Sequence, residues 1–166
     1  AQQFASSVAT DPIGNSFIVW TDTRDNYHTE IYGRRFDRQG NPVTDDLKIS
    51  DSLGLGNSVY YWSRGFPAIS LNNLGLYLIV WPHFGFAGQG IYGQRYDING
   101  TRLGVNYKVI PYNILDDRSV HPHIYALPNS NFIVCWNDNR NGNWDIYAQK
   151  LNGLGLPIGS QFMVND

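Results

Sequence analysis

Aromatic and basic side chains gather in two stretches of the sequence that lack a strand pattern. One is Tyr60-Tyr-Trp-Ser-Arg64, and the other is a glycine-rich stretch that begins at His83. Aromatic rings beside arginine dominate binding hot spots, and exposed rings also stack on sugars. We therefore predict a surface that binds a protein or a carbohydrate; the alternative is that these rings only cover the ends of the strands below. The candidate ligand-binding residues are Tyr60, Tyr61, Trp62, Arg64, His83, Phe84, Phe86 and Trp144.

Two acid–arginine pairs have the same spacing, Asp22 with Arg24 and Asp138 with Arg140. Such a pair can bind an ion, but an ion pair that closes a turn is the simpler interpretation. Glu30 and Asp145 occupy equivalent positions downstream, and we expect them to be the second partners of the two arginines.

Histidine and cysteine give weak signals. His121 and His123 could bind a metal, with His83 nearby, but no third ligand follows at a short fixed spacing. We predict no metal site and no cofactor. Cys135 aligns with two valines, Val19 and Val80, and is therefore expected to be a buried small hydrophobic residue and not a nucleophile.

An internal repeat must position these candidates. An apolar run ends in tryptophan three times, at Trp20, Trp81 and Trp136, and we expect all three to be core residues because they occupy one equivalent position in every unit. An Ile-Tyr pair follows each run, a glycine follows each Tyr by 8 residues, and an aliphatic residue follows each glycine by 9. A further aliphatic residue precedes each Trp by 12, and a repeat of this kind indicates a repeated supersecondary unit. The tyrosines are Tyr32, Tyr92 and Tyr147, the glycines are Gly40, Gly100 and Gly155, and the aliphatic residues are Val8, Ile69, Ile124, Ile49, Val109 and Val164.

Each repeat unit is expected to contain four short strands and no helix. The segment 91–97 alternates in polarity as a strand does, and Asx-x-x-Gly segments such as 37–40 and 97–100 are typical of tight hairpin turns. The second strand of each unit, which runs into the tryptophan, is apolar at almost every position. Both of its faces must therefore be covered, as they are in a sheet stacked between two others.

The segment 132–147 resembles the blade motif of TolB-like, WD40-related β-propellers. In that motif an apolar strand runs into an Asp-x-Arg-x-Gly turn followed by Asp-Ile-Tyr, here Asp138 to Tyr147. Unit one repeats the motif at 21–25 and 30–32, whereas unit two has Pro82 to Gly90 in its place. The resemblance implies propeller blades of a periplasmic or secreted interaction module, and it does not imply an activity.

The predicted fold is therefore all-β, with three four-stranded antiparallel repeats that form β-propeller blades. We place the repeats at 4–51, 66–112 and 121–166 within a single domain, residues 1–166. A propeller closes with four to eight blades, so three blades need self-association or a longer parent chain. The alternative fold is a β-trefoil, which closes with three repeats.

The length variation of the repeat predicts which end of the blades carries the function. The intervals that span the one–two and three–four turns are constant, while Trp to Ile varies between 10 and 11 residues and the connections between units vary most. In an antiparallel four-stranded unit, the variable connections all lie at one end. Variable loops on a fixed scaffold commonly carry binding residues.

An enzyme is not expected. A propeller glycosidase needs two facing carboxylates, and the predicted innermost strands, near 6–10, 67–71 and 122–126, contain no acid. We therefore predict a non-catalytic binding or interaction module, with structural blades of a larger or oligomeric propeller as the alternative and a glycosidase as a poorer one.

Composition narrows the remaining classes. The formal charge is −2, which argues against a nucleic-acid partner, and no apolar run is long enough to span a membrane. The chain does not begin with Met and is poor in Lys, and we expect a secreted, periplasmic or cell-surface bacterial protein. The expected partners are a protein or carbohydrate ligand and further blades.

Overall fold

The computed structural model describes residues 1–24, 29–51, 65–83, 89–111 and 120–165. Within these ranges the chain forms strands and no helix, so no described helix could cross a membrane. The strands are β1 (Gln3–Thr10), β2 (Ser16–Asp22), β3 (Glu30–Phe36), β4 (Leu47–Lys48), β5 (Ala68–Leu71), β6 (Leu76–His83), β7 (Gly90–Asp97), β8 (Arg102–Pro111), β9 (His123–Ala126), β10 (Phe132–Asp138), β11 (Asp145–Leu151) and β12 (Pro157–Met163).

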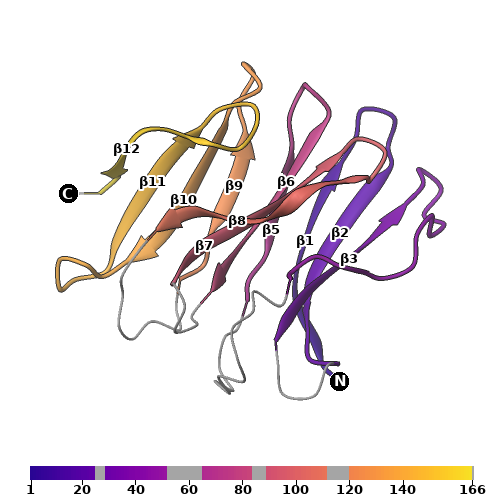
Figure 1. The fold of residues 1–166 in the computed structure, drawn as a ribbon, viewed down its shortest axis with the longest axis horizontal. Helices are drawn as coiled ribbons and strands as arrows, with labels where there is room; N and C mark the ends of the chain where they lie inside the picture. The colour runs from indigo at the N-terminus through magenta and orange to yellow at the C-terminus, as the bar shows by residue number, and fades with distance from the viewer. Residues whose placement is uncertain (25–28, 52–64, 84–88, 112–119, 166) are drawn as a thin grey trace.

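The strands form three antiparallel sheets, each of four strands in sequence order. We call β1–β4 blade 1, β5–β8 blade 2 and β9–β12 blade 3. The blades stand side by side in Figure 1, with the first strands β1, β5 and β9 adjacent to one another. This stack of separate sheets confirms the predicted blade fold and excludes the β-trefoil.

Side-chain hydrogen bonds close the tight turns. In the turn after β5, the side-chain oxygen of Asn72 accepts hydrogen bonds from the backbone N–H groups of Leu74 and Leu76, both at 3.0 Å. Gly75 follows with φ of 77°, a conformation that glycine adopts without strain. Asp97 holds the turn after β7 in the same way. This local chemistry fixes the hairpins that the spacing predicted.

Two glutamines stabilise bulges in the outer strands of blades 2 and 3. The Gln94 amide donates to the backbone carbonyls of Leu103 and Gly104 where the β7–β8 register shifts. Gln149 donates to Ile158 and Gly159 at the equivalent shift between β11 and β12. Each bulge therefore has its carbonyls satisfied by one buried side chain.

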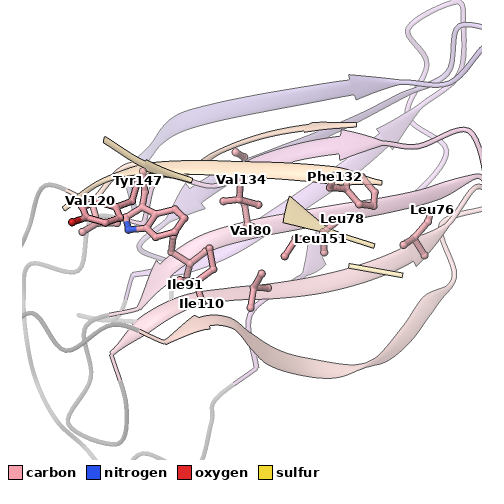
Figure 2. Close-up of a cluster of buried hydrophobic side chains, with 13 residues drawn as sticks. Leu76, Leu78, Val80, Ile91, Ile110, Val120, Phe132, Val134, Tyr147 and Leu151 are labelled. Atoms are coloured by element: carbon pink, nitrogen blue, oxygen red, sulfur yellow. The ribbon is translucent and has the colours of Figure 1, made fainter. Parts of the chain in front are cut away.

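The apolar core lies in two layers between the blades. One layer packs Phe17, Val19 and Ile31 of blade 1 against Ile79 and Trp81 of blade 2. The other joins blades 2 and 3, and Figure 2 shows its side chains, among them Leu78, Val80, Phe132 and Val134. Because β6 lies between the two layers, it is buried on both faces.

The second strands of the outer blades differ from this pattern. Along β2 and β10 the burial alternates, because only one face of each strand packs on blade 2. The expectation that every second strand is covered on both faces is thus correct for β6 alone. We call the uncovered face of blade 1 the N flank and that of blade 3 the C flank.

Candidate functional site

The two ends of the blades carry different kinds of connection between strands. At one end β2, β6 and β10 finish, at Asp22, His83 and Asp138, and the third strand of each blade begins. We call this the loop end; it is the end marked N in Figure 1. The tight turns lie at the opposite, turn end. The two–three and inter-blade connections thus leave from one end, as the repeat spacing predicted.

A tryptophan, an aspartate and an arginine form the same unit at the loop end of blades 1 and 3. In blade 1 the Trp20 indole donates to Asp22 at 3.1 Å, and Arg24 donates through its backbone N–H at 2.8 Å and through its guanidinium. The guanidinium lies 4.3 Å from the ring centre of Tyr32. Trp136, Asp138, Arg140 and Tyr147 repeat this arrangement. Each carboxylate is therefore occupied in closing its turn.

The donors around these two carboxylates keep them ionised. Burial alone would raise the pKa of Asp22, but the hydrogen bonds from Arg24, Trp20 and Gln3 outweigh it and lower the pKa to about 2. Asp138 is also buried, and its bonds to Arg140 and Trp136 lower its pKa in the same way. Neither group can hold a proton at neutral pH, so neither suits the role of a general acid.

The second partners of the arginines differ from the prediction. Arg24 pairs with Asp46 at 2.8 Å, and Asp46 also accepts from Arg34 at 2.9 Å. Glu30 instead pairs with Lys48 at 3.1 Å and accepts from the Ser50 hydroxyl. In blade 3, Asp145 accepts from Asn165. The assignment of Glu30 and Asp145 as second partners was therefore wrong; it overlooked the segment between β3 and β4.

His83 is the candidate residue that lies between two blades. Its ring meets that of Tyr92 edge-on, with 5.1 Å between the centroids, and its Nε2 is buried without a hydrogen-bond partner among the described residues. Burial lowers its pKa; Glu30 opposes this effect and Lys108 adds to it. The imidazole is therefore neutral at physiological pH and serves as part of the packing between blades 1 and 2.

Trp144 is the candidate whose ring faces solvent. It lies in the connection between β10 and β11, and half of the residue, 50%, is exposed. Beside it, Asn141 donates to the Tyr147 hydroxyl at 2.7 Å and holds the base of the connection. An exposed indole at this end offers a flat apolar surface to a ligand.

The other predicted binding residues, Tyr60, Tyr61, Trp62, Arg64, Phe84 and Phe86, lie outside the described residues. The structure brings His83 and Trp144 to the same end of the blades but places them in different blades. The centroid of the His121 ring lies 3.9 Å from that of Phe66, with an angle of 53° between the ring planes, and His123 is exposed on β9. Within the described ranges, no three side chains of His, Cys, Asp or Glu are grouped as metal ligands.

Two residues predicted to lie in the core are only partly buried. Trp81 and Trp136 are buried as predicted, but Trp20 is partly exposed because its side chain faces the N flank. Cys135 is also partly exposed and faces the C flank, although its equivalents Val19 and Val80 are buried. Its thiol pKa is raised by burial, which does not favour a thiolate nucleophile.

Comparison with solved structures defines the class of fold. An endo-arabinase from Bacteroides thetaiotaomicron matches with a TM-score of 0.55 and 12% identity over 90% of this chain and 55% of its own. A glycosyl hydrolase from Bacteroides ovatus matches with a TM-score of 0.52 and 10% identity over 95% and 49%. A protein described with the GH130 mannoside phosphorylases and glycoside hydrolases matches with a TM-score of 0.53 and 9% identity over 96% and 50%.

The chain is thus an all-β protein with the fold of a partial β-propeller, and it spans about half the length of these structures. No protein-family model and no curated protein matches it. The comparisons therefore establish the fold, but they do not support membership of the TolB-like or WD40-related families.

The comparison also corrects one prediction. The sequence led us to expect that the chain is not an enzyme, but the structures it resembles are described as glycoside hydrolases and phosphorylases. The expectation rested on the absence of acids from three innermost strands. Because those strands belong to about half of a propeller, they could not decide the chemistry of a complete one.

Proposed function

We propose that these three blades are part of a larger β-propeller whose loop end binds a carbohydrate. The observation that carries the proposal is the half-exposed indole of Trp144 at the loop end. Indole rings stack on sugar rings, and the sequence predicts Tyr60 to Trp62, Arg64, Phe84 and Phe86 as further ligand-binding candidates. The similar structures include an endo-arabinase and a protein described with mannoside phosphorylases, which indicates the ligand class to test.

Polysaccharide binding can be tested directly with arabinan and yeast mannan as probes. Electrophoresis of the protein through gels that contain one polysaccharide should show retarded migration. Trp144→Ala should weaken the retardation by about threefold to tenfold, since aromatic stacking contributes about 0.5–1.5 kcal/mol. Leu154→Ala is the control, because Leu154 is similarly exposed but lies in the turn after β11, at the turn end.

The outcomes separate the possibilities. Binding to neither polysaccharide, or equal binding by wild type and Trp144→Ala, would contradict the proposed site. Reducing ends released during the same incubation would extend the function from binding to glycoside hydrolysis, the activity described for similar structures.

The proposal also implies a location. Polysaccharides such as arabinan are met outside the cytoplasm, so a secreted, periplasmic or cell-surface location follows from the ligand class. The scarcity of Lys and the bacterial source of the similar structures support it. Fractionation of the source cells tests it, and recovery in the cytosol alone would contradict it.

A further inference from the structure

The C flank exposes apolar residues whose equivalents in the other blades are buried. Ile31 and Ile91, the first isoleucines of β3 and β7, are 2% and 0% exposed, whereas the equivalent Ile146 of β11 is 42% exposed. Ile31 belongs to the layer between blades 1 and 2, and Ile91 to the layer between blades 2 and 3. Ile146 therefore has the position of a residue that packs on a following blade.

The aliphatic residue nine positions after the glycine of each repeat shows the same contrast. Ile49 and Val109 are 0% and 1% exposed, while the equivalent Val164 is 56% exposed. Val164 lies beside Ile146, since its N–H donates to the Ile146 carbonyl at 2.7 Å. The two side chains form a continuous apolar surface on the C flank, and Cys135 lies on the same face.

The N flank has the complementary character. Val8 of β1 is 56% exposed, whereas the equivalent Ile69 of β5 is 6% exposed and packs on blade 1. Val8 pairs with Ile18 across the β1–β2 ladder, so both side chains lie on the face opposite Phe17 and Val19. Trp20 is on this face as well, whereas its equivalents Trp81 and Trp136 are buried against the preceding blade.

A basic residue joins each blade to the next at the turn end. Arg35 of blade 1 donates to the backbone carbonyls of Ile98 and Asn99 in the turn of blade 2. Arg95 of blade 2 donates to the carbonyl of Leu154 in the turn of blade 3, at 3.4 Å. Lys150 has the same place in blade 3, three residues after the blade's Tyr, and is exposed on the C flank. Its side chain is therefore placed to donate to the turn of a following blade.

We propose that a second copy of this chain covers both flanks, with the C flank of each copy on the N flank of the other. This proposal rests on the proposed function, in which the three blades are part of a larger propeller. It identifies the remaining blades as those of a second copy of the chain. The junction between blades 1 and 2 and that between blades 2 and 3 show which contacts each flank would make with a neighbouring blade. The N flank is equivalent to the face by which blades 2 and 3 pack on the preceding blade. The C flank is equivalent to the face by which blades 1 and 2 pack on the following blade. The two flanks of one chain therefore complement each other.

The length of the similar structures agrees with two copies. This chain spans about half of each, so two copies together have about the length of one such structure. A head-to-tail contact forms a closed ring when the rotation closes, and the two copies then share two identical junctions. By equivalence, Ile146 and Val164 of one copy pack on Ile18 and Trp20 of the other. Lys150 donates to the backbone carbonyls of Arg38 and Gln39, which are equivalent to Ile98 and Asn99.

Sedimentation velocity over a wide range of protein concentration tests the assembly without any carbohydrate. We expect the mass of two chains. A single chain at every concentration would overturn the proposal, and open-ended assemblies of increasing size would overturn the closed pair. A dimer that binds no polysaccharide would contradict only the proposed function, while a monomer that binds polysaccharide would contradict only the second copy.

Two exposed valines allow a sharper test of the head-to-tail arrangement. Val8→Asp places a charge on the N flank and Val164→Asp places one on the C flank, so each variant alone should be monomeric. An equimolar mixture should recover mixed dimers, because one of its two junctions joins two unaltered flanks. Val105→Asp is the matched control; Val105 is 74% exposed on β8 of the middle blade and should leave the dimer intact.

The mixture also excludes the symmetric alternatives. If identical flanks met, one of the two variants would dimerise normally by itself, and the mixture would recover nothing new. Circular dichroism and urea unfolding of each variant should match the wild-type chain at low concentration. A variant that is unfolded is replaced by Val8→Lys or Ile146→Asp, which charge the same flanks.

Discussion

The Trp136 indole and the Asp138 carboxylate, two residues apart on β10, are joined by a 3.1 Å hydrogen bond. Residues at this spacing share one face of a strand, so the bond needs no distortion of the backbone. Arg140 then caps the same carboxylate and lies 4.1 Å from the Tyr147 ring centre. The motif that carries the family resemblance is therefore a local set of contacts that stabilises the end of one strand and the start of the next.

Asp22→Asn should lower the stability of the chain at neutral pH and reduce its loss of stability in acid. The pKa of Asp22 is lowered from 3.8 to about 2, because the bonds from Arg24 outweigh the opposing effect of burial. A lowered folded-state pKa gives stability that is present above the unfolded value and is lost as pH falls through about 4 to about 2. We expect a loss of roughly 1–3 kcal/mol at neutral pH.

Urea unfolding at a series of pH values measures this effect. The wild-type midpoint should fall more steeply in the acid range than that of Asp22→Asn. Asp45→Asn is the control, because Asp45 is exposed and has no ion pair among the described residues. Parallel pH curves for wild type and Asp22→Asn would show that the Arg24 pair does not supply this stability.

Gln94→Leu should destabilise the chain more than the equivalent Gln149→Leu. Gln94 is fully buried; besides the bulge carbonyls, it accepts from Asn106 at 2.7 Å and from Arg102 at 3.0 Å. Its loss removes the side chain that donates to the two bulge carbonyls and removes one of the two bonds made by the Asn106 amide, whereas Arg102 keeps its bond to Asp51. We expect about 3 kcal/mol for Gln94→Leu and about 1 kcal/mol for Gln149→Leu, which lies in the blade with an open flank. Urea unfolding measures both, with the exposed Gln39→Leu as control, and equal losses would contradict the role of the wider network.

The repeat predicted the strands well because its information is local. Turn residues such as Asp97 and Gly100 act within a few positions, and the apolar run into Trp81 shows directly that both faces of a strand are covered. The same pattern misled at Trp20 and Cys135, since a repeat shows equivalence but not that the terminal repeats lack a neighbour.

Contacts between blades could not be predicted in this way. The bonds from Arg35 to Ile98 and Asn99 join residues more than 60 positions apart and end on backbone carbonyls, which carry no sequence signature. The pairing of Arg24 with Asp46 likewise depends on how the segment before β4 folds back. The candidate site was predictable only as an end of the blades, through the varying length of the connections.

His83→Phe should remove a pH dependence of stability near neutrality. Burial lowers the pKa of His83 below its ordinary 6.5, with Glu30 opposing and Lys108 assisting. In the unfolded chain His83 takes up a proton as the pH falls through about 6.5, but in the folded chain it stays neutral to a lower pH, so stability is lost as the pH falls below that value. Phe keeps a ring against Tyr92 and cannot titrate.

The urea midpoint across this pH range is the measurement. The wild-type midpoint should decrease as the pH is lowered, and that of His83→Phe should change less. His123→Gln replaces an exposed histidine of β9 and should retain the wild-type slope. If His83→Phe keeps the full slope instead, the titrating group lies elsewhere.

Ile91→Ala and Ile146→Ala make the same change at equivalent positions, and they should differ in their dependence on protein concentration. Ile91 is fully buried between blades 2 and 3, so its truncation should cost about 2–5 kcal/mol at any concentration. Ile146 is 42% exposed in the single chain, so at low concentration its truncation should cost roughly 1 kcal/mol or less. In the proposed pair of copies Ile146 is buried, and its cost should rise as the protein becomes dimeric. Thermal unfolding at several concentrations separates the two variants; a small cost for Ile146→Ala that does not change with concentration would mean that no second copy covers the C flank.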